Sequence, residues 1–275
     1  MTILDCRPFL AVGVSFIAAV LIAFSRRWPN LRETWSVIAS VLKFGIILSM
    51  LPAVLDGNQY QWTLCQITDT VGLTLRTDPA GMIFAVLASM LWVPMNFYSI
   101  GYMRCNNESE QTGYFAAFAI CMSAVMGIAM AENLLTFFIF YELLTLASYP
   151  LVLHKRNQEA LMASRKYLIY TLISGQLFLA GVIAVYCISG TMDFTPGGFL
   201  TTDMAPRWVL QAIFVLMILA GSVKAAVMPL HGWLPAAMIA PTPVSALLHA
   251  VAVVKTGVFA VLRIICLLYT SDAAD

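Results

Sequence analysis

Long apolar stretches alternate with short polar connections along this chain, and the pattern predicts helices that cross a membrane. A helix needs about 20 apolar residues to cross the hydrocarbon core of a bilayer. Eight stretches of that order are present, at residues 9–25, 34–55, 80–102, 113–131, 133–153, 166–188, 208–228 and 244–268. The alternation over about ten residues that marks a membrane β-barrel is not visible. We therefore predict an all-α, polytopic transmembrane bundle of about eight helices, forming a single membrane domain over residues 1–275.

Composition leads to the same class of protein. Of the 275 residues, 61% are hydrophobic and 11% are charged, whereas about a quarter of the residues in soluble domains are charged. The net charge of +1 gives no reason to expect nucleic acid as a partner. The six cysteines are scattered without metal-ligand or redox spacing. We expect a lipid environment, no metal and no cofactor.

The distribution of basic residues predicts the orientation in the membrane. Arg26 and Arg27 follow the first apolar run, so we interpret that run as a retained helix rather than a signal peptide. The connections after the first, third and fifth spans carry most of the basic residues outside the spans. The opposite side holds only Arg7, Arg76 and Arg207. Because lysine and arginine are enriched in cytoplasmic loops, the N-terminus is expected outside.

Three polar segments interrupt or end the helical pattern. Residues 56–79 alternate apolar and polar positions in part, which favours a short external hairpin. Residues 189–207 contain a Pro-Gly-Gly turn signal and are predicted to be an external loop. Residues 269–275 follow the last span without a basic anchor, so we expect them to be a truncated or non-native tail.

Charged residues inside the predicted spans are the candidates for chemistry. A charge at a helix centre costs roughly 2.5–3.5 kcal/mol, so such residues usually face a bundle interior or a hydrated cavity. Glu142 lies in the middle of the fifth span, with Thr145 and Tyr149 on the same helix face. It is interpreted as an ionisable group on an ion path, and the alternative is a hydrogen-bonded packing residue.

Lys224 lies late in the seventh span, five residues before Pro229. A proline lacks the backbone donor and crowds the preceding turn, so the helix is predicted to depart from regular geometry between Ala225 and Met228. A broken helix in a membrane must be buried in protein or line a cavity. We therefore predict that Lys224 belongs to an ion path, with Glu142 as the available carboxylate.

The other intramembrane cations are less informative. Lys255 lies about halfway along the eighth predicted span, where a buried lysine can exchange its proton. His249 is either a relay group or a hydrogen-bonded core histidine. Lys43 has no evident partner and is interpreted mainly as a packing or membrane-surface lysine. Arg263 is expected to extend to the membrane surface, and Glu132, at a span boundary, is expected to be solvated.

Several motifs resemble the antiporter-like membrane subunits of respiratory complex I (NADH:quinone oxidoreductase), membrane-bound hydrogenases and Mrp-type cation/proton antiporters. The resemblance covers about residues 70–265. Its segments are Ser222–Pro235, Ala240–His249, Asn133–Glu142, Asp78–Gly81 and Tyr98–Met103.

In that family a glutamate on the fifth helix pairs with a lysine on a broken seventh helix, and a lysine on the eighth helix continues the path. The matching positions are Glu142, Lys224 and Lys255, and His249 matches a histidine of the hydrophilic axis. The family fold has two inverted five-helix repeats. The resemblance implies N-terminal helices in residues 1–110 and the first, proton-conducting repeat in residues 111–268.

The resulting prediction is a proton- or cation-translocating subunit of a multisubunit complex, with other membrane subunits as partners and H⁺ or Na⁺ as the ion. The resemblance implies a location in the bacterial plasma membrane, and it favours an Mrp or hydrogenase-like assembly slightly over complex I. A self-sufficient solute transporter is the alternative, but it would need polar side chains clustered around a substrate pocket. A redox enzyme would need a Rossmann fingerprint, clustered cysteines or paired helical histidines, which are absent from the sequence.

Overall fold

The described part of the chain is predominantly helical, as the apolar pattern predicts. The computed structural model describes residues 2–67, 71–195, 197–198, 200–201, 203–250 and 252–268, with the backbone alone for 247–250 and 266–268. The helices are α1 (Arg7–Phe24), α2 (Pro29–Leu55), α3 (Pro79–Cys105), α4 (Gln111–Ala129), α5 (Leu134–Val152), α6 (Gln158–Ser189), α7 (Arg207–Lys224), α8 (Trp233–Ala237), α9 (Thr242–Ala250) and α10 (Val253–Leu268), with a 3₁₀ turn η1 (Leu230–Gly232).

Within the described residues, seven helices, α1 to α7, are long and apolar enough to cross a membrane. Local capping sets several of their first residues. The side chains of Asp78, Asn133 and Asn157 each accept a hydrogen bond from a backbone N–H in the first turn of α3, α5 and α6, which satisfies one of the free donors there. The prediction of a polytopic transmembrane helix bundle is confirmed.

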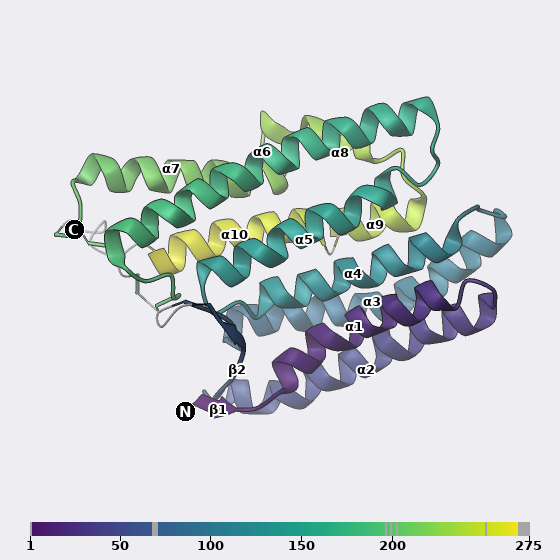
Figure 1. Cartoon of the computed structure of the whole chain (residues 1–275), viewed down its shortest axis with the longest axis horizontal. Coiled ribbons are helices and arrows are strands. Elements are labelled where there is room, and N and C mark those ends of the chain that lie inside the picture. The colour runs from purple at the N-terminus through teal and green to yellow at the C-terminus, as the bar shows by residue number, and fades with distance from the viewer. Residues whose placement is uncertain are drawn as a thin grey trace.

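Helix α4 lies at the centre of the bundle. Figure 1 shows α1, α2 and α3 on one side of α4, with α5 and α10 on the other side and α6 to α8 beyond them. Helix α4 packs against both α1 and α5. Its apolar window is 78% buried, more than that of any other candidate span. The N-terminal helices and α5, which carries Glu142, therefore meet at α4, while α7, which carries Lys224, packs against α6 and α10.

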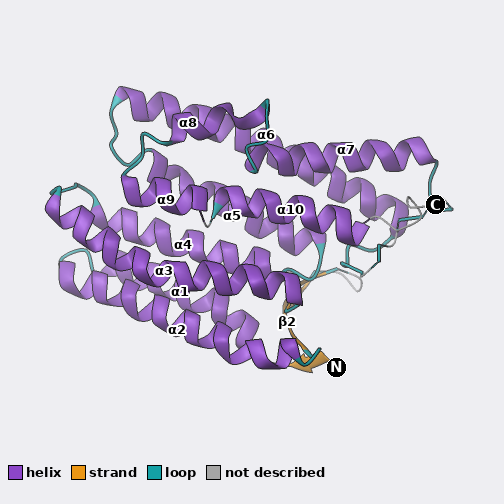
Figure 2. Cartoon of the chain, turned by 180° about the vertical axis from the view of Figure 1, so that it is seen from behind, coloured by secondary structure: helices purple, strands orange, loops and turns teal. Residues whose placement is uncertain are grey.

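A small sheet covers the end of the bundle where the chain begins (Figure 2). Strand β2 (Gln59–Gln66) pairs antiparallel with β3 (Gly72–Arg76) and parallel with β1 (Thr2–Leu4). The hairpin expected in residues 56–79 is therefore confirmed, and β1 is an addition that the sequence did not suggest.

Glu132 connects this hairpin to the α4–α5 corner, and the expectation that it is solvated was wrong. Its side chain is 12% exposed and forms an ion pair of 3.2 Å with Arg76, while Gln61 donates a hydrogen bond of 2.9 Å to it. Burial raises the pKa of the Glu132 carboxyl, against the opposing effect of Arg76. The corner between the two helices is thus closed by a polar cluster.

The predicted eighth span, residues 244–268, is divided into two helices. Helix α9 ends at Ala250 and α10 begins at Val253. Lys255 is therefore the third residue of α10 rather than a residue halfway along a continuous span. The tail predicted at residues 269–275 lies outside the described residues.

Arg263 joins the far end of α10 to the start of α3, so the prediction that it extends to the membrane surface was wrong. The residue is 5% exposed, and its guanidinium donates hydrogen bonds of 2.8 and 2.5 Å to the two carboxylate oxygens of Asp78. It also lies over the ring of Phe259, 4.8 Å from the centroid. A bidentate pair of this kind is strong and directional, and it fixes α10 against α3.

Candidate functional site at the end of α7

Helix α7 ends at Lys224 in a closed backbone motif. Ala226 has a φ of 55°, in the left-handed region. Its N–H donates to the Val223 carbonyl at 3.1 Å, and the N–H of Val227 donates to the Ser222 carbonyl at 3.0 Å. This is the Schellman arrangement that terminates helices. The predicted departure from helix between Ala225 and Met228 is confirmed, and the chain turns at Ala226, ahead of Pro229.

Replacing Ala226 with glycine is expected to raise the free energy of unfolding by roughly 0.5–1 kcal/mol. The left-handed conformation is strained for an L-residue, and glycine removes that strain at some cost in unfolded-state entropy. Ala225→Gly is the matched control, because Ala225 has an ordinary φ of −69° and should lose stability instead. Denaturant unfolding of the purified full-length subunit measures both changes. A loss of stability in Ala226→Gly would contradict the left-handed turn.

Neighbouring elements close around the end of α7. The indole N–H of Trp233 donates to the Val223 carbonyl at 2.7 Å, and Trp233 is fully buried. A Cβ added at Gly257 of α10 would overlap the backbone of Lys224 and Ala225. The close approach of α10 therefore requires glycine at this position. The last turn of α7 is thus packed against protein, whereas Val227, Met228 and Pro229, which follow the turn, are exposed in this chain.

The Lys224 ammonium is held by a carbonyl and an aromatic ring of α5. Lys224 is fully buried. Its Nζ donates to the Tyr141 carbonyl at 2.5 Å and lies 3.3 Å from the centroid of the Tyr141 ring. Both contacts stabilise a cation, but neither supplies a full negative charge. Taking an ammonium out of water is costly. Whether Lys224 stays charged therefore depends on whether a negatively charged group lies near its ammonium.

Polar contacts among three helices hold Tyr141 in position. The Tyr141 hydroxyl donates to the Ala220 carbonyl of α7 at 3.3 Å and lies 3.3 Å from the Ser174 hydroxyl of α6. Ser174 donates to the same Ala220 carbonyl at 2.7 Å. The ring on which Lys224 rests is thus fixed by α6 and α7 together.

The charges of Glu142 and Lys224 interact, but the Lys224 ammonium does not donate its hydrogen bond to the Glu142 carboxylate. The two side chains interact through their charges, while Lys224 donates to the Tyr141 carbonyl instead. The buried Oε1 atom of Glu142 has no hydrogen-bond partner among the described residues. A Cβ added at Gly175 of α6 would overlap this carboxylate, so glycine at 175 makes the space that Glu142 occupies.

The other two predicted site residues are placed differently. Lys255 is exposed on the outer face of α10, although it lies two residues from Gly257, which packs against the end of α7. His249 lies near the end of α9, and its side chain is outside the described part of the structure. The site assembled here therefore contains Glu142 and Lys224, and the roles of Lys255 and His249 stay predictions.

Sequence reasoning did not single out Tyr141, Ser174 or Gly175. Each of them acts through a contact between helices. The Tyr141 carbonyl accepts a hydrogen bond from Lys224, and the Ser174 hydroxyl bonds to the Tyr141 hydroxyl. Gly175 leaves space for the Glu142 carboxylate. Nothing in their type or spacing announces this. Only the position of Tyr141 next to Glu142 gave a signal, and that signal was weak because aromatic residues are frequent throughout these spans.

A transmembrane helix, α7, that ends on a fully buried lysine, with a glutamate of α5 within electrostatic reach, defines a polytopic membrane protein with an ionisable interior. The chain belongs to the family of NADH:quinone oxidoreductase/Mrp antiporter membrane subunits, whose model matches residues 131–274. The matched region runs from the corner before α5 to beyond α10 and includes all four predicted site residues. The family resemblance inferred from the sequence motifs is confirmed.

Curated relatives point to the same family. The chain is 28% identical over 240 residues to an antiporter subunit, mnhA2, of Staphylococcus haemolyticus, covering 86% of this chain and 30% of the relative. It is also 28% identical over 274 residues to an NAD(P)H-quinone oxidoreductase subunit 5 of Paulinella chromatophora, covering 94% of this chain and 40% of the relative. The chain therefore spans well under half the length of these relatives.

Solved structures show the same fold. A chain of the Mrp complex from Dietzia sp. DQ12-45-1b superposes with a TM-score of 0.82 at 25% identity, covering 94% of this chain and 28% of the other. A chain of the membrane-bound sulfane sulfur reductase, an archaeal respiratory membrane complex, superposes with a TM-score of 0.84 at 23% identity, covering 94% and 53%. The second likeness concerns the fold alone.

Proposed function

We propose that this chain forms the proton-translocating region of a membrane subunit that works within a multisubunit antiporter or respiratory complex. The observation that carries the proposal is the fully buried Lys224 at the end of α7, held by the Tyr141 carbonyl and within electrostatic reach of Glu142. Ionisable groups at membrane depth are energetically costly, and where they occur they usually mark an ion or proton path. Family membership supports a role in moving protons or other cations.

The proposed cycle depends on how Glu142 and Lys224 approach each other. When Glu142 is ionised and near, its charge stabilises the ammonium and the proton is retained. When Glu142 is protonated or distant, burial favours the neutral amine and Lys224 releases its proton. The proton then moves toward the eighth-span residues, with His249 and Lys255 as the proposed next groups. Tyr141 holds the Lys224 ammonium while Glu142 changes from one of these two states to the other.

The proposed partners are further membrane subunits. The relatives are named as an antiporter subunit and a quinone oxidoreductase subunit, and the similar structures belong to multisubunit complexes. Lys255 faces outward from the described helices, where another segment or subunit can meet it and take the proton onward. Measuring proton uptake in vesicles with and without a Na⁺ gradient distinguishes translocation of H⁺ alone from exchange of H⁺ for Na⁺.

Replacing Glu142 with glutamine is the direct test. The amide keeps the shape of the side chain and removes its charge, so assembly should be retained while proton uptake falls by roughly 10²-fold or more. Uptake is measured with a pH-sensitive dye in vesicles containing the complete complex with the full-length subunit, with and without a Na⁺ gradient. Glu159→Gln is the matched control, because Glu159 is exposed in the first turn of α6. Wild-type uptake in assembled Glu142→Gln would refute the proposed role.

We also propose that the N-terminus faces the outside of the plasma membrane. Basic residues gather at the end of the bundle opposite the small sheet, which supports a cytoplasmic location for that end. In a background without the native cysteines, Lys155→Cys should react with an impermeant thiol reagent from the cytoplasm only. Asp193→Cys, at the sheet end, should react from outside only. The reverse pattern would overturn the orientation.

A further inference from the structure

Helix α2 carries a polar stripe that the proposed path does not use. Glu33, Ser36, Ser40 and Lys43 are spaced three, four and three residues apart, so they lie along one face of the helix. All four are buried, and Ser36, Ser40 and Lys43 are fully buried. The stripe extends about 15 Å along the helix axis. Beyond Lys43 the same face continues with apolar residues, Ile47 and Met50.

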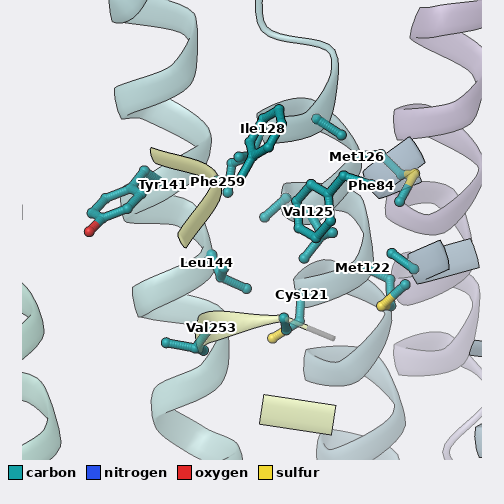
Figure 3. Packing of buried hydrophobic residues seen from close by; sticks show 14 of the residues in the cluster. Phe84, Cys121, Met122, Val125, Met126, Ile128, Tyr141, Leu144, Val253 and Phe259 are labelled. Carbon is teal, nitrogen blue, oxygen red and sulfur yellow. The ribbon is translucent and has the colours of Figure 1, made fainter. Parts of the chain in front are cut away.

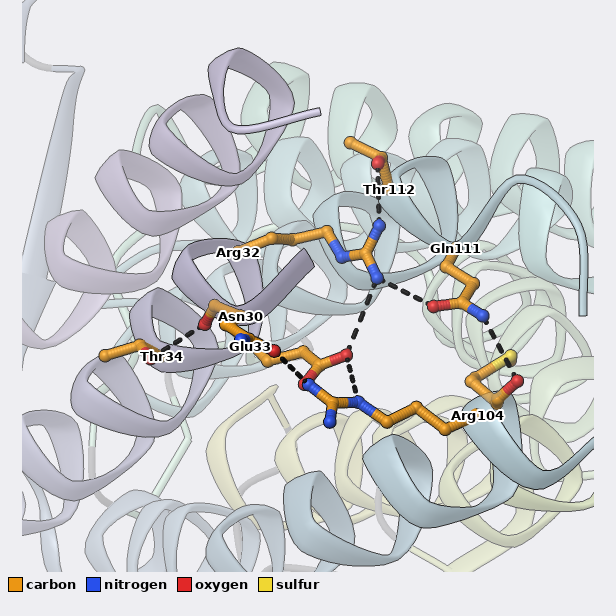
Figure 4. Close-up of polar contacts among 8 residues, drawn as sticks. Asn30, Arg32, Glu33, Thr34, Arg104, Gln111 and Thr112 are labelled. Carbon is orange, nitrogen blue, oxygen red and sulfur yellow. Dashed lines mark hydrogen bonds and ion pairs between the residues drawn. The ribbon is translucent and has the colours of Figure 1, made fainter. Parts of the chain in front are cut away.

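The outer end of the stripe opens to the basic end of the bundle. Glu33 pairs with Arg104, whose Nε donates to it at 3.1 Å, and lies 3.6 Å from an Arg32 nitrogen (Figure 4). The Arg104 side chain is half exposed, at 51%. A surface cavity of about 350 Å³ is lined by Glu33 and Arg104, together with Val37 of the next turn. Glu33 is thus the point where this buried stripe meets the surface.

Hydrogen-bonding groups continue inward from Glu33. The Ser36 hydroxyl donates to the Asn96 side chain of α3 at 2.7 Å, and Asn96 donates back to the Ser36 carbonyl at 3.2 Å. The Ser40 hydroxyl, one turn deeper, donates within its own helix to the Val37 carbonyl at 2.8 Å. Hydroxyls both donate and accept hydrogen bonds, so groups of this kind, with water between them, can pass protons along the buried face of α2.

Lys43 ends the stripe in surroundings that resemble those of Lys224. Its Nζ donates to the Met122 carbonyl of α4 at 2.8 Å and lies 4.8 Å from the Trp92 ring centroid. The Trp92 indole N–H is buried without a hydrogen-bond partner among the described residues, and such a donor favours water or another acceptor beside it. Each lysine is therefore held by one backbone carbonyl of a neighbouring helix and one aromatic face.

The two lysines flank the same turn of α4. Lys43 bonds to the carbonyl of Met122, and the preceding residue, Cys121, interacts electrostatically with Lys224. Figure 3 shows Cys121 on the side of α4 that faces Leu144 and Val253, and Met122 on the side toward the N-terminal helices. Helix α4 thus lies between the end of the polar stripe and the site at the end of α7.

We propose that Lys43 is a second proton-carrying site, supplied from the surface through Glu33, Ser36 and Ser40 on α2. The inference rests on the proposed function and extends it to the N-terminal helices. The Lys43 ammonium gives one proton to a water molecule beside the unpaired Trp92 N–H and becomes a neutral amine. Glu33 takes one proton from the surface, and the Ser36 and Ser40 hydroxyls, bridged by water, relay it to the amine, each accepting one proton as it gives one. One proton leaves and one enters, and water is the co-reactant. A purely packing lysine would need only its charge and its contacts with Met122 and Trp92.

Lys43→Arg separates these two roles, because arginine can keep both contacts but does not release its proton. In vesicles containing the complete complex with the full-length subunit, we expect Lys43→Arg to assemble and to take up protons roughly tenfold more slowly or worse. Lys155→Arg is the control, since Lys155 is exposed in the connection between α5 and α6. Assembled Lys43→Arg complex with uptake within about twofold of wild type overturns the proposal.

A second variant decides the matter if arginine is too large for assembly. The double substitution Ser36→Ala and Ser40→Ala removes both hydroxyls from the polar stripe and leaves the contacts of Lys43 intact. We expect it to assemble and to slow proton uptake several-fold, and wild-type uptake would overturn the proposal. Wild-type complex without any proton uptake would refute the proposed function itself. Uptake that Glu142→Gln abolishes and both α2 variants leave unchanged would refute this inference alone.

Discussion

Lys224→Arg should abolish proton translocation while leaving the complex assembled. Arginine retains the positive charge and can still donate to the Tyr141 carbonyl, which now receives the Lys224 ammonium at 2.5 Å. Arginine does not release its proton near neutral pH, however, so a cycle in which the side chain alternates between its charged and neutral forms stops. We expect a loss of roughly 10²-fold or more in uptake, measured with the dye assay on vesicles that contain the complete complex.

The control for this substitution is Lys166→Arg, because Lys166 lies on α6 near the surface connection and is exposed. Assembly is checked by the yield of intact complex on native gels. If assembled Lys224→Arg complex transports at a near-normal rate, Lys224 is a fixed charge and the switching role fails. Lys224→Met then distinguishes a fixed charge that is required from one that is dispensable.

The second large effect concerns stability. Asp78→Asn should lower the free energy of unfolding by roughly 3–5 kcal/mol, because it leaves the Arg263 guanidinium buried without its carboxylate. Arg263 is 5% exposed and both of its hydrogen bonds to Asp78 are lost or weakened. Asparagine is as good a helix N-cap as aspartate, so the cap of α3 is retained. Denaturant unfolding of the purified subunit measures the loss.

Asp203→Asn is the matched control, since Asp203 is exposed in the connection before α7 and should change stability little. Combining Asp78→Asn with Arg263→Met should recover part of the loss, because no unpaired charge then stays buried. A loss below about 1 kcal/mol for Asp78→Asn would be typical of a solvent-screened pair. That result would contradict the buried bidentate contact.

The sequence alone determined the class of fold. Spans of about 20 apolar residues must become helices in lipid, since no water is present to satisfy their backbone groups, and the structure has helices at each of the first seven predicted spans. The break after Lys224 was also predictable, because Pro229 lacks a backbone donor and crowds the preceding turn. The cost of burying a charge made Glu142 and Lys224 candidates before any contact was known.

The tertiary structure decided what those charges touch. Arg263 was expected at the membrane surface, but Asp78, far away in the sequence, places its carboxylate beside the guanidinium. Lys43 had no evident partner because its acceptor is a backbone carbonyl of α4, and backbone carbonyls have no signature in a sequence. Lys224 likewise bonds to the carbonyl of Tyr141 rather than to Glu142 directly.

The physical reason is the difference between local and non-local information. Apolar periodicity, helix caps and helix breakers act within a few residues, so a single sequence displays them. Close approaches between helices depend on which residues lack a side chain, as Gly175 does beside Glu142 and Gly257 beside the end of α7. A glycine becomes meaningful only when the opposite surface is known. The sequence therefore identified the ionisable groups, and only the packing of α4, α5, α6, α7 and α10 decided how they are held.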